Sequence, residues 1–168
     1  MNLIVNVNQD WAIGANNELL NYIKGDMQFF RETTLNKTVI LGRKTLATFP
    51  NGAPLKNREN LILTHHPESL PENCMGFSSV ADLLAYVSPL PSEDVWVIGG
   101  EQVYRLFLPY CTLAEITKTE NRSESPDAFF PNLDQMENWN CIKHSNPIEE
   151  NSIRYTFNTY KNSSPMEY

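Results

Sequence analysis

Val95-Trp96-Val97-Ile98-Gly99-Gly100-Glu101-Gln102-Val103-Tyr104 is the stretch of sequence that indicates the fold class. Its first four residues form a short apolar run typical of a buried strand. From Gln102 to Leu108 the sequence fits a helix, which Pro109 cannot continue. The two consecutive glycines predict a sharp turn with a backbone conformation that a Cβ atom would obstruct. A strand that passes directly into a helix is typical of an α/β protein.

The same alternation of strand-like and helix-like segments extends in both directions. Four more apolar runs predict strands over Leu3–Val7, Thr38–Leu41, Leu61–Thr64 and Ala114–Thr119. Apolar residues at helical spacing predict helices over Asp26–Thr34 and from Ser79 onward. Ser79 and Asp82 form a capping-box-like pattern. Asp26 is expected at the start of its helix, where a carboxylate suits both the cap and the dipole.

The C-terminal part follows a different pattern. Ile153, Tyr155 and Phe157 alternate with polar residues, which predicts an antiparallel strand with Cys141–Ser145 as its partner. We therefore expect a single-domain α/β fold with a central, mostly parallel mixed sheet of about eight strands, an antiparallel C-terminal edge and about four flanking helices. The domain is expected to span residues 1–162, followed by a flexible C-terminal tail over residues 163–168.

The composition limits the classes of function. The chain has 168 residues and a formal net charge of -7, which argues against broad nucleic-acid binding. No apolar run is long enough to span a bilayer and no signal-peptide pattern occurs, so we expect a cytoplasmic protein. Cys74, Cys111 and Cys141 are widely spaced and predict free thiols, with neither a disulfide framework nor a metal site. Nothing in the sequence indicates an obligate dimer, and we expect a monomer.

Three segments are candidates for chemistry. One segment, Gly42-Arg43-Lys44-Thr45, follows a strand. Its glycine lets a ligand come close to the backbone, and the helix N–H groups and cations that follow suit a phosphate. The alternative is a tight turn with solvated charges. Gly99-Gly100 could likewise admit a pyrophosphate, or be only a turn. Asp26 lies near Met27 and Phe30, so its carboxylate could bind a proton-sharing heterocycle, or simply cap its helix. The G-x-G-x-x-G and G-x-x-x-x-G-K-[ST] fingerprints are absent.

Seven separated segments form a specific pattern when they are taken together. In order they are Ile13-Gly14, Asp26-Met27-x-x-Phe30, Ile40-Leu41-Gly42-Arg43-Lys44-Thr45, Pro54-Leu55-x-x-Arg58-x-Asn60, Val97-Ile98-Gly99-Gly100-x-x-x-Tyr104, Glu115-Ile116-Thr117 and Asp127-x-x-Phe130-Pro131. This order and spacing resemble the dihydrofolate reductases of bacterial type over nearly the whole chain. The resemblance implies an enzyme that transfers a hydride from NADPH to C6 of dihydrofolate, while a water protonates N5.

The resemblance also assigns roles to individual residues. Asp26 matches the carboxylate that binds the pterin, and Thr117 matches its hydroxyl partner, which acts through a water. Asn21 stands where a tryptophan commonly orders an active-site water. The residues that match the substrate-binding positions are Val5, Phe30, Phe49, Leu55, Arg58 and Ile98. For Val5 and Ile98 the match is to backbone carbonyls near the pterin amino group. The residues that match the cofactor-binding positions are Ile13, Gly14, Gly42, Arg43, Lys44, Thr45, Thr64, His65, Gly99, Gly100, Gln102 and Tyr104. The loop from about Gln9 to Lys24 matches the family's lid over the nicotinamide.

The sequence departs from the family pattern in the lid and in a later loop. Asn21 replaces a tryptophan, Lys24-Gly25-Asp26 replaces the usual Pro-x-Asp, and Pro126 and Ala128 replace a glycine and a threonine. Three alternatives stay open, and these changes support only the second of them. One is a pyrimidine reductase of riboflavin synthesis, another is a catalytically weak or silent NADPH- or folate-binding paralogue, and a third is an acidic α/β interaction domain.

Overall fold

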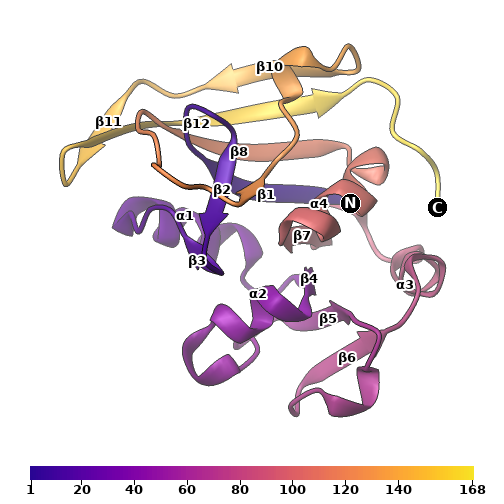
Figure 1. The fold of residues 1–168 in the computed structure, drawn as a ribbon. Helices are drawn as coiled ribbons and strands as arrows, with labels where there is room; N and C mark the ends of the chain where they lie inside the picture. The colour runs from indigo at the N-terminus through magenta and orange to yellow at the C-terminus, as the bar shows by residue number, and fades with distance from the viewer.

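Eight strands lie side by side in the central sheet of the computed structural model, which describes residues 1–168 (Figure 1). In spatial order they are β10 (Trp139–His144), β12 (Ile153–Asn162), β8 (Leu113–Thr119), β1 (Asn2–Val7), β7 (Val95–Gly99), β4 (Thr38–Gly42), β5 (Glu59–Leu63) and β6 (Cys74–Phe77). The strands from β8 to β6 are parallel, whereas β12 is antiparallel to β8 and β10. The short β11 (Ile148–Glu150) also pairs with β12. This arrangement confirms the predicted fold class.

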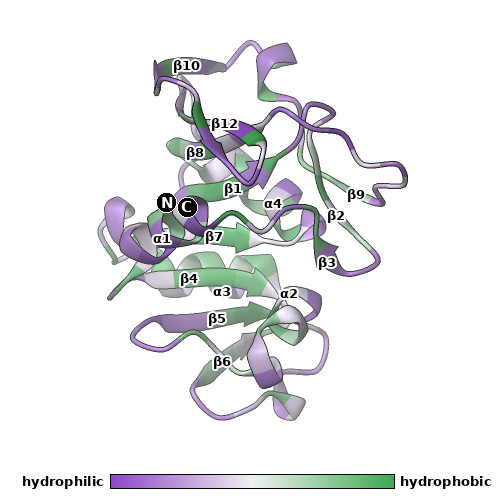
Figure 2. Cartoon of the chain, turned by 90° about the vertical axis from the view of Figure 1, so that its left-hand side faces the viewer, coloured by the Kyte–Doolittle hydropathy of each residue, from purple (hydrophilic) through white to green (hydrophobic).

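The middle strands divide their side chains between two hydrophobic clusters, one on each face of the sheet. On β1, Leu3, Val5 and Val7 belong to the larger cluster and Ile4 belongs to the smaller one. Successive side chains of a strand point to opposite faces, so a strand buried on both faces is apolar throughout. Figure 2 shows this character as the green of β1, β7 and β4 between largely purple loops. The strand prediction for these runs rested on the same property.

Four α-helices cover the two faces. Buried residues of α3 (Val80–Val87) and α4 (Glu101–Phe107) join the larger cluster. Leu46 of α2 (Arg43–Thr48) joins the smaller cluster, against which Phe29 and Phe30 of α1 (Lys24–Thr34) pack. As predicted, the Ser79 side chain caps α3 by accepting a hydrogen bond from the Asp82 N–H at 3.1 Å. None of these helices is long and apolar enough to cross a membrane.

The N-terminus of α1 differs from the expectation that Asp26 caps it. The helix begins at Lys24, so Asp26 is its third residue, and Ile23 at the N-cap makes no side-chain cap. The N–H groups of Lys24 and Gly25 instead donate to the Glu150 carboxylate, at 2.5 and 3.1 Å. The negative charge of Glu150 suits the positive end of the helix dipole. The cap therefore comes from β11, far along the chain.

A second, small sheet stands apart from the main one. It consists of β2 (Ala12–Ala15) between β3 (Glu18–Leu19) and β9 (Ala128–Phe129). Asp127 fixes it further, because its side chain accepts from Asn16 N–H at 2.9 Å and its own N–H donates to the Gly14 carbonyl at 3.1 Å. In Figure 2 this sheet lies on the side of the molecule where β7 ends. It contains much of the segment expected to form the lid.

The last residues lie against the body of the protein. The expected domain boundary at residue 162 coincides with the end of β12. Beyond it, the Met166 N–H donates to the Pro109 carbonyl at 2.9 Å, and the Tyr168 hydroxyl accepts from the N-terminal ammonium group of Met1 at 2.8 Å. The two ends of the chain are therefore neighbours, as Figure 1 also shows. The segment expected to be a flexible tail makes these specific contacts.

Glu150 provides a test of the long-range cap. We expect Glu150→Ala to lower the free energy of unfolding by about 1–2 kcal/mol, because two helix N–H groups lose their acceptor. Chemical denaturation measures this change. The neighbouring Glu149→Ala removes the same charge from an exposed residue and serves as the control, with an expected effect within about 0.5 kcal/mol. Equal effects of the two substitutions would contradict the capping role.

Candidate active site

The carboxylate of Asp26 lies between two neighbouring strands. Its Oδ2 atom accepts a hydrogen bond from Asn6 Nδ2 at 2.8 Å, and its Oδ1 atom accepts one from Thr117 Oγ1 at 2.6 Å. Asn6 on β1 and Thr117 on β8 are direct partners in the parallel ladder. Burial raises the pKa of Asp26, and the two hydrogen bonds oppose that shift by stabilising the charged form. Asp26 and Thr117 were expected together, whereas Asn6 was missed.

Tyr104 lies between β1, which carries Asn6, and the end of β7 at Gly99. The Tyr104 side chain is buried, and its hydroxyl donates to the Ile4 carbonyl at 2.8 Å. Burial and the nearby charge of Asp26 both raise the pKa of Tyr104, so its hydroxyl remains protonated. Gly99 has φ +128°, and a Cβ atom there would lie 3.3 Å from the Tyr104 ring. The glycine is needed both for its backbone conformation and for this close approach.

The starts of α2 and α4 meet at the same edge of the sheet. Leu41 at the end of β4 pairs with Gly99 at the end of β7, and each strand continues into its helix. A Cβ atom on Gly100 would lie 3.0 Å from Thr45 Oγ1, and one on Gly42 would lie 3.1 Å from Val103. Side chains larger than hydrogen at these two positions would fill the narrow space between the helices. The obstruction predicted for the Gly99-Gly100 turn is therefore present, and Gly42 shows a similar one.

Cationic and hydroxyl side chains stand beside these helix starts. Arg43 and Lys44 are exposed on the first turn of α2, and neither forms an ion pair with a carboxylate. Thr64 and His65 follow β5, the strand next to β4. The Thr64 hydroxyl accepts from the His66 N–H at 3.1 Å, so it can still donate to another group. Unpaired cations and free donors next to helix N–H groups are the features of a phosphate site.

Arg58 lies near the opposite end of α1 from Asp26. Its guanidinium donates to the Thr34 hydroxyl at 3.1 and 3.2 Å and to the carbonyls of Lys56 and Arg31 at 2.8 and 3.3 Å. No carboxylate lies within ion-pair distance of it. Partial burial and the charge of Arg31 lower the pKa of Arg58. These contacts fix the guanidinium while leaving its charge without a counterion.

An apolar wall connects the two charged ends. Phe30, Phe49 and Leu55 are half-buried and pack against the smaller hydrophobic cluster, which includes Ile98. Val5 was expected to contribute its backbone carbonyl, and its side chain lies in the larger cluster on the other face of the sheet. On β1 it is Ile4 that belongs to the wall, and its carbonyl meets Tyr104.

The remaining expected residues are divided between the lid and α4. Ile13 and Gly14 lie on β2, where Gly14 is buried, and Gln102 is exposed at the start of α4. Asn21 is not directed to Asp26. Its amide and that of Asn121 exchange hydrogen bonds at 2.6 and 3.3 Å, and its Nδ2 also donates to Thr119 Oγ1 at 3.1 Å. The segment expected to form the lid is thus held to the loop after β8, at the position where the family pattern has tryptophan.

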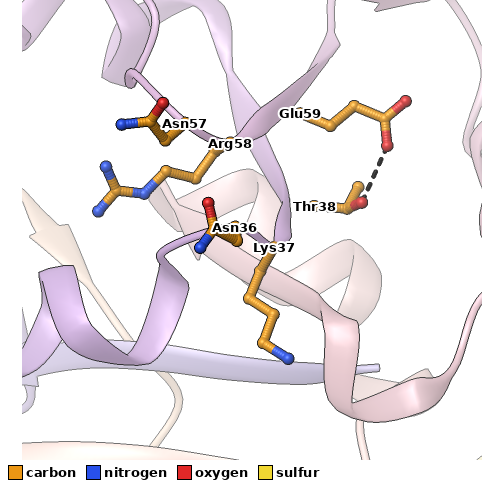
Figure 3. Close-up of a pocket in the computed structure, with 6 residues that line it drawn as sticks. All are labelled: Asn36, Lys37, Thr38, Asn57, Arg58 and Glu59. Carbon is orange, nitrogen blue, oxygen red and sulfur yellow. Dashed lines mark hydrogen bonds between the residues drawn. The ribbon is translucent and has the colours of Figure 1, made fainter.

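The cavity drawn in Figure 3 lies elsewhere. It measures about 460 Å³ and is lined by six residues at the amino ends of β4 and β5: Asn36, Lys37, Thr38, Asn57, Arg58 and Glu59. Lys37 forms an ion pair with Asp94, and the Thr38 hydroxyl donates to Glu59 at 2.9 Å. None of the six lining residues is hydrophobic. Only Arg58 belongs to both regions, and we assign the site to the carboxyl ends of the strands, where Asp26 lies.

Two residues with a function in this geometry escaped the sequence analysis. Glu150 could not be found, because nothing in the sequence connects it to Lys24 and Gly25. Asn6 did leave a signal, because a polar residue inside an apolar run is unusual for a central parallel strand. Because successive side chains of a strand alternate between its faces, the pattern places Asn6 on the face of β1 opposite to Val5 and Val7.

Known proteins with a similar sequence or structure agree on one family. Residues 1–162 match the family described as dihydrofolate reductase. The dihydrofolate reductase of Bacillus subtilis is 35% identical over 90% of this chain and 89% of its own length, and that of Heliothis virescens is 32% identical over 96% of each chain. The solved structure of dihydrofolate reductase from Enterococcus faecalis, complexed with NADP(H) and RAB-propyl, superposes with a TM-score of 0.83 at 26% identity and covers 97% of this chain and 96% of that one. On these matches, together with the geometry above, the chain belongs to the dihydrofolate reductase family.

Proposed function

We propose that the protein reduces 7,8-dihydrofolate to 5,6,7,8-tetrahydrofolate with NADPH, and so supplies one-carbon and thymidylate metabolism. The observation that carries this proposal is the pair of charged groups at the two ends of α1. Asp26 lies in its first turn, and Arg58 contacts Thr34 in its last turn. Eight residues of helix separate Asp26 from Thr34, which corresponds to about 12 Å. A molecule with a hydrogen-bonding heterocycle at one end and a carboxylate at the other fits this spacing.

The Asp26 end suits a pterin. A pterin presents an amino group and a ring N–H side by side, and a carboxylate with two oxygens can accept both. Thr117 and Asn6 hold these oxygens in a fixed plane. Phe30, Phe49, Leu55 and Ile98 supply apolar contact for the rings. The Ile4 carbonyl beside Tyr104 is a further acceptor at this end, in addition to the one expected at Val5.

The Arg58 end suits the carboxylate of the glutamate moiety. A guanidinium can bind a carboxylate through two parallel hydrogen bonds. Arg58 is held by neutral acceptors only, so an incoming carboxylate meets an uncompensated positive charge. Contacts at both ends of the substrate align its reacting ring without any covalent participation of the protein.

The edge formed by β4, β5 and β7 fits NADPH. At Gly42 and Gly100, which have no side chain, the pyrophosphate would lie close to the protein backbone, near Thr45 and Gln102. Arg43, Lys44, Thr64 and His65 would hold the 2′-phosphate. Ile13, Gly14, Gly99 and Tyr104 would line the nicotinamide site. NADPH, when bound, supplies the hydride for C6, and a water supplies the proton for N5.

The chain's own contribution to the proton step is electrostatic. Asp26 polarises the pterin from its amino side and does not itself reach N5, in keeping with the family mechanism. The lid around β2 and β3 limits access of bulk water. Asn21 takes part by holding the base of the lid to Asn121, and its amide groups are already paired there. This pairing is the one feature that favours a weak or silent paralogue as the second candidate.

A single assay separates the two candidates. Purified protein with dihydrofolate and NADPH is followed by the loss of NADPH absorbance. Turnover that methotrexate blocks supports the proposed reductase. Binding of both ligands without turnover supports the silent paralogue, and absence of folate binding contradicts both.

Asp26→Asn tests the role of the carboxylate. We expect turnover at neutral pH to fall by about 100-fold or more, because the charge that polarises the pterin is lost. Burial raises the pKa of Asp26, so the ionised carboxylate disfavours the folded state once the pH rises through that raised pKa. The variant should therefore unfold at a temperature equal to or above that of the parent, measured by circular dichroism. Near-normal turnover would refute the role.

Arg58→Ala tests the glutamate end. The KM for dihydrofolate is expected to rise by about 30-fold with a smaller change in kcat, since a charged hydrogen-bond pair contributes about 2 kcal/mol to binding. Arg58→Lys keeps the charge but cannot form two parallel hydrogen bonds. Its KM for dihydrofolate should therefore lie between that of the parent protein and that of Arg58→Ala. Arg154→Ala, on the exposed side of β12, is the control with no expected change. An unchanged KM in Arg58→Ala excludes this contact.

Arg43→Ala tests the choice of cofactor. The KM for NADPH should rise by about ten-fold, because the 2′-phosphate loses a charge-assisted hydrogen bond. The KM for NADH, which lacks that phosphate, should stay the same and provides the internal control. Equal losses with both cofactors would place Arg43 elsewhere in the cofactor site.

A further inference from the structure

Asn6 is an unexpected side chain at the centre of the sheet. β1 lies between β7 and β8 and is hydrogen-bonded on both sides. Its neighbours in sequence, Val5 and Val7, are buried in the larger hydrophobic cluster. Asn6 points to the other face, where its amide donates to Asp26 Oδ2 at 2.8 Å. A polar side chain in such a strand lowers the stability of the fold unless it is hydrogen-bonded. The hydrogen-bond partner of Asn6 is Asp26, the candidate catalytic carboxylate.

Asn6 and Thr117 divide the two carboxylate oxygens between them. Thr117 donates to Oδ1 and Asn6 donates to Oδ2, from positions directly opposite each other on adjacent strands. Two donors on two oxygens restrict rotation of the carboxylate about its terminal bond. With Thr117 alone, Oδ2 would have no donor from the protein. The orientation of the acid therefore depends on both strands.

Asp26 has no cation to balance its charge. No lysine, arginine or histidine lies within ion-pair distance of it. The titratable groups that face it are Tyr104 from α4 and Tyr155 from β12, and Glu150 from β11 lies beside Tyr155. Burial raises the pKa of both tyrosines, and the charge of Asp26 adds to the shift of each, after that of Glu150 in the case of Tyr155. Both tyrosines therefore stay neutral. Stabilisation of the carboxylate therefore falls to its two neutral donors.

We propose that Asn6 is a positioning residue for Asp26: its amide fixes the carboxylate plane through Oδ2 and favours the charged form of the acid. Its consequence for turnover rests on the proposed function, whereas its effect on the ionisation of Asp26 does not. Without Asn6, burial acts on the carboxylate with one opposing hydrogen bond instead of two. The acid then takes up a proton at higher pH and loses its charge where the pterin donors need it.

The direct test is a titration of Asp26 by carbon-13 NMR of its carboxyl group, in protein without ligands. In Asn6→Leu, which keeps a similar volume, the midpoint is expected to rise by about one pH unit, the equivalent of one hydrogen bond to a charged group. Asn6→Ala gives the same direction if the larger side chain impairs folding. Asn2→Leu is the control, because Asn2 lies on the same face of β1 and makes no hydrogen bond to Asp26. An unchanged midpoint in both Asn6 variants overturns the proposal.

Turnover distinguishes this inference from the proposed function. The acid limb of the pH profile of kcat/KM should move upward with the NMR midpoint in Asn6→Leu, and not in Asn2→Leu. In the Asp26→Asn background, Asn6→Leu should change kcat/KM by less than about two-fold, because no acid remains to be positioned. A large loss in that background overturns the proposal in favour of a structural role. A moved midpoint with an unmoved profile supports the coupling of Asn6 to Asp26 and contradicts the catalytic role of Asp26.

Discussion

Parallel pairing of the four middle strands is the constraint on which the site depends. β8, β1, β7 and β4 all point the same way, so their carboxyl ends meet at one edge. The same register that buries Val5 and Val7 places Asn6 opposite Thr117, and it brings Leu41 beside Gly99. The first pair receives the carboxylate of Asp26, and the second brings the starts of α2 and α4 together. A slip of one residue in either ladder would turn these side chains to the wrong face.

The elements that the sequence could predict are those whose signal is local. The apolar runs of β1, β4, β5, β7 and β8 follow from burial on both faces, and the cap of α3 from Ser79 and Asp82. The short strands β2, β3, β6, β9 and β11 were not anticipated, because segments of two to four residues have too few positions to show a period. Their pairing depends on partners distant in the sequence, such as Gly14 with Ala128.

The sequence motifs and the family resemblance predicted part of the site. Asp26 and Thr117 lie together as expected, but through a direct hydrogen bond rather than through a water. Gly99, expected at the cofactor site, lies against Tyr104. The role expected for the Val5 carbonyl stays a prediction, because burial of the Val5 side chain in the larger cluster does not decide what its carbonyl can bind. Asn6 could have been recognised from its polarity within an apolar run. The replacement of the usual Pro-x-Asp by Lys24-Gly25-Asp26 could be seen but not explained, because Glu150 and Tyr155, which contact this turn, come from the other end of the chain.

The distant origin of the α1 cap has a consequence for biosynthesis. A nascent polypeptide leaves the ribosome from its amino end, so residues 24–34 are available long before Glu150. Until the β11–β12 hairpin arrives, the first turn of α1 has no acceptor for two of its N–H groups and β8 has no antiparallel neighbour. The carboxylate of Asp26 thus gains its final surroundings only after residues 148–162 have been synthesised.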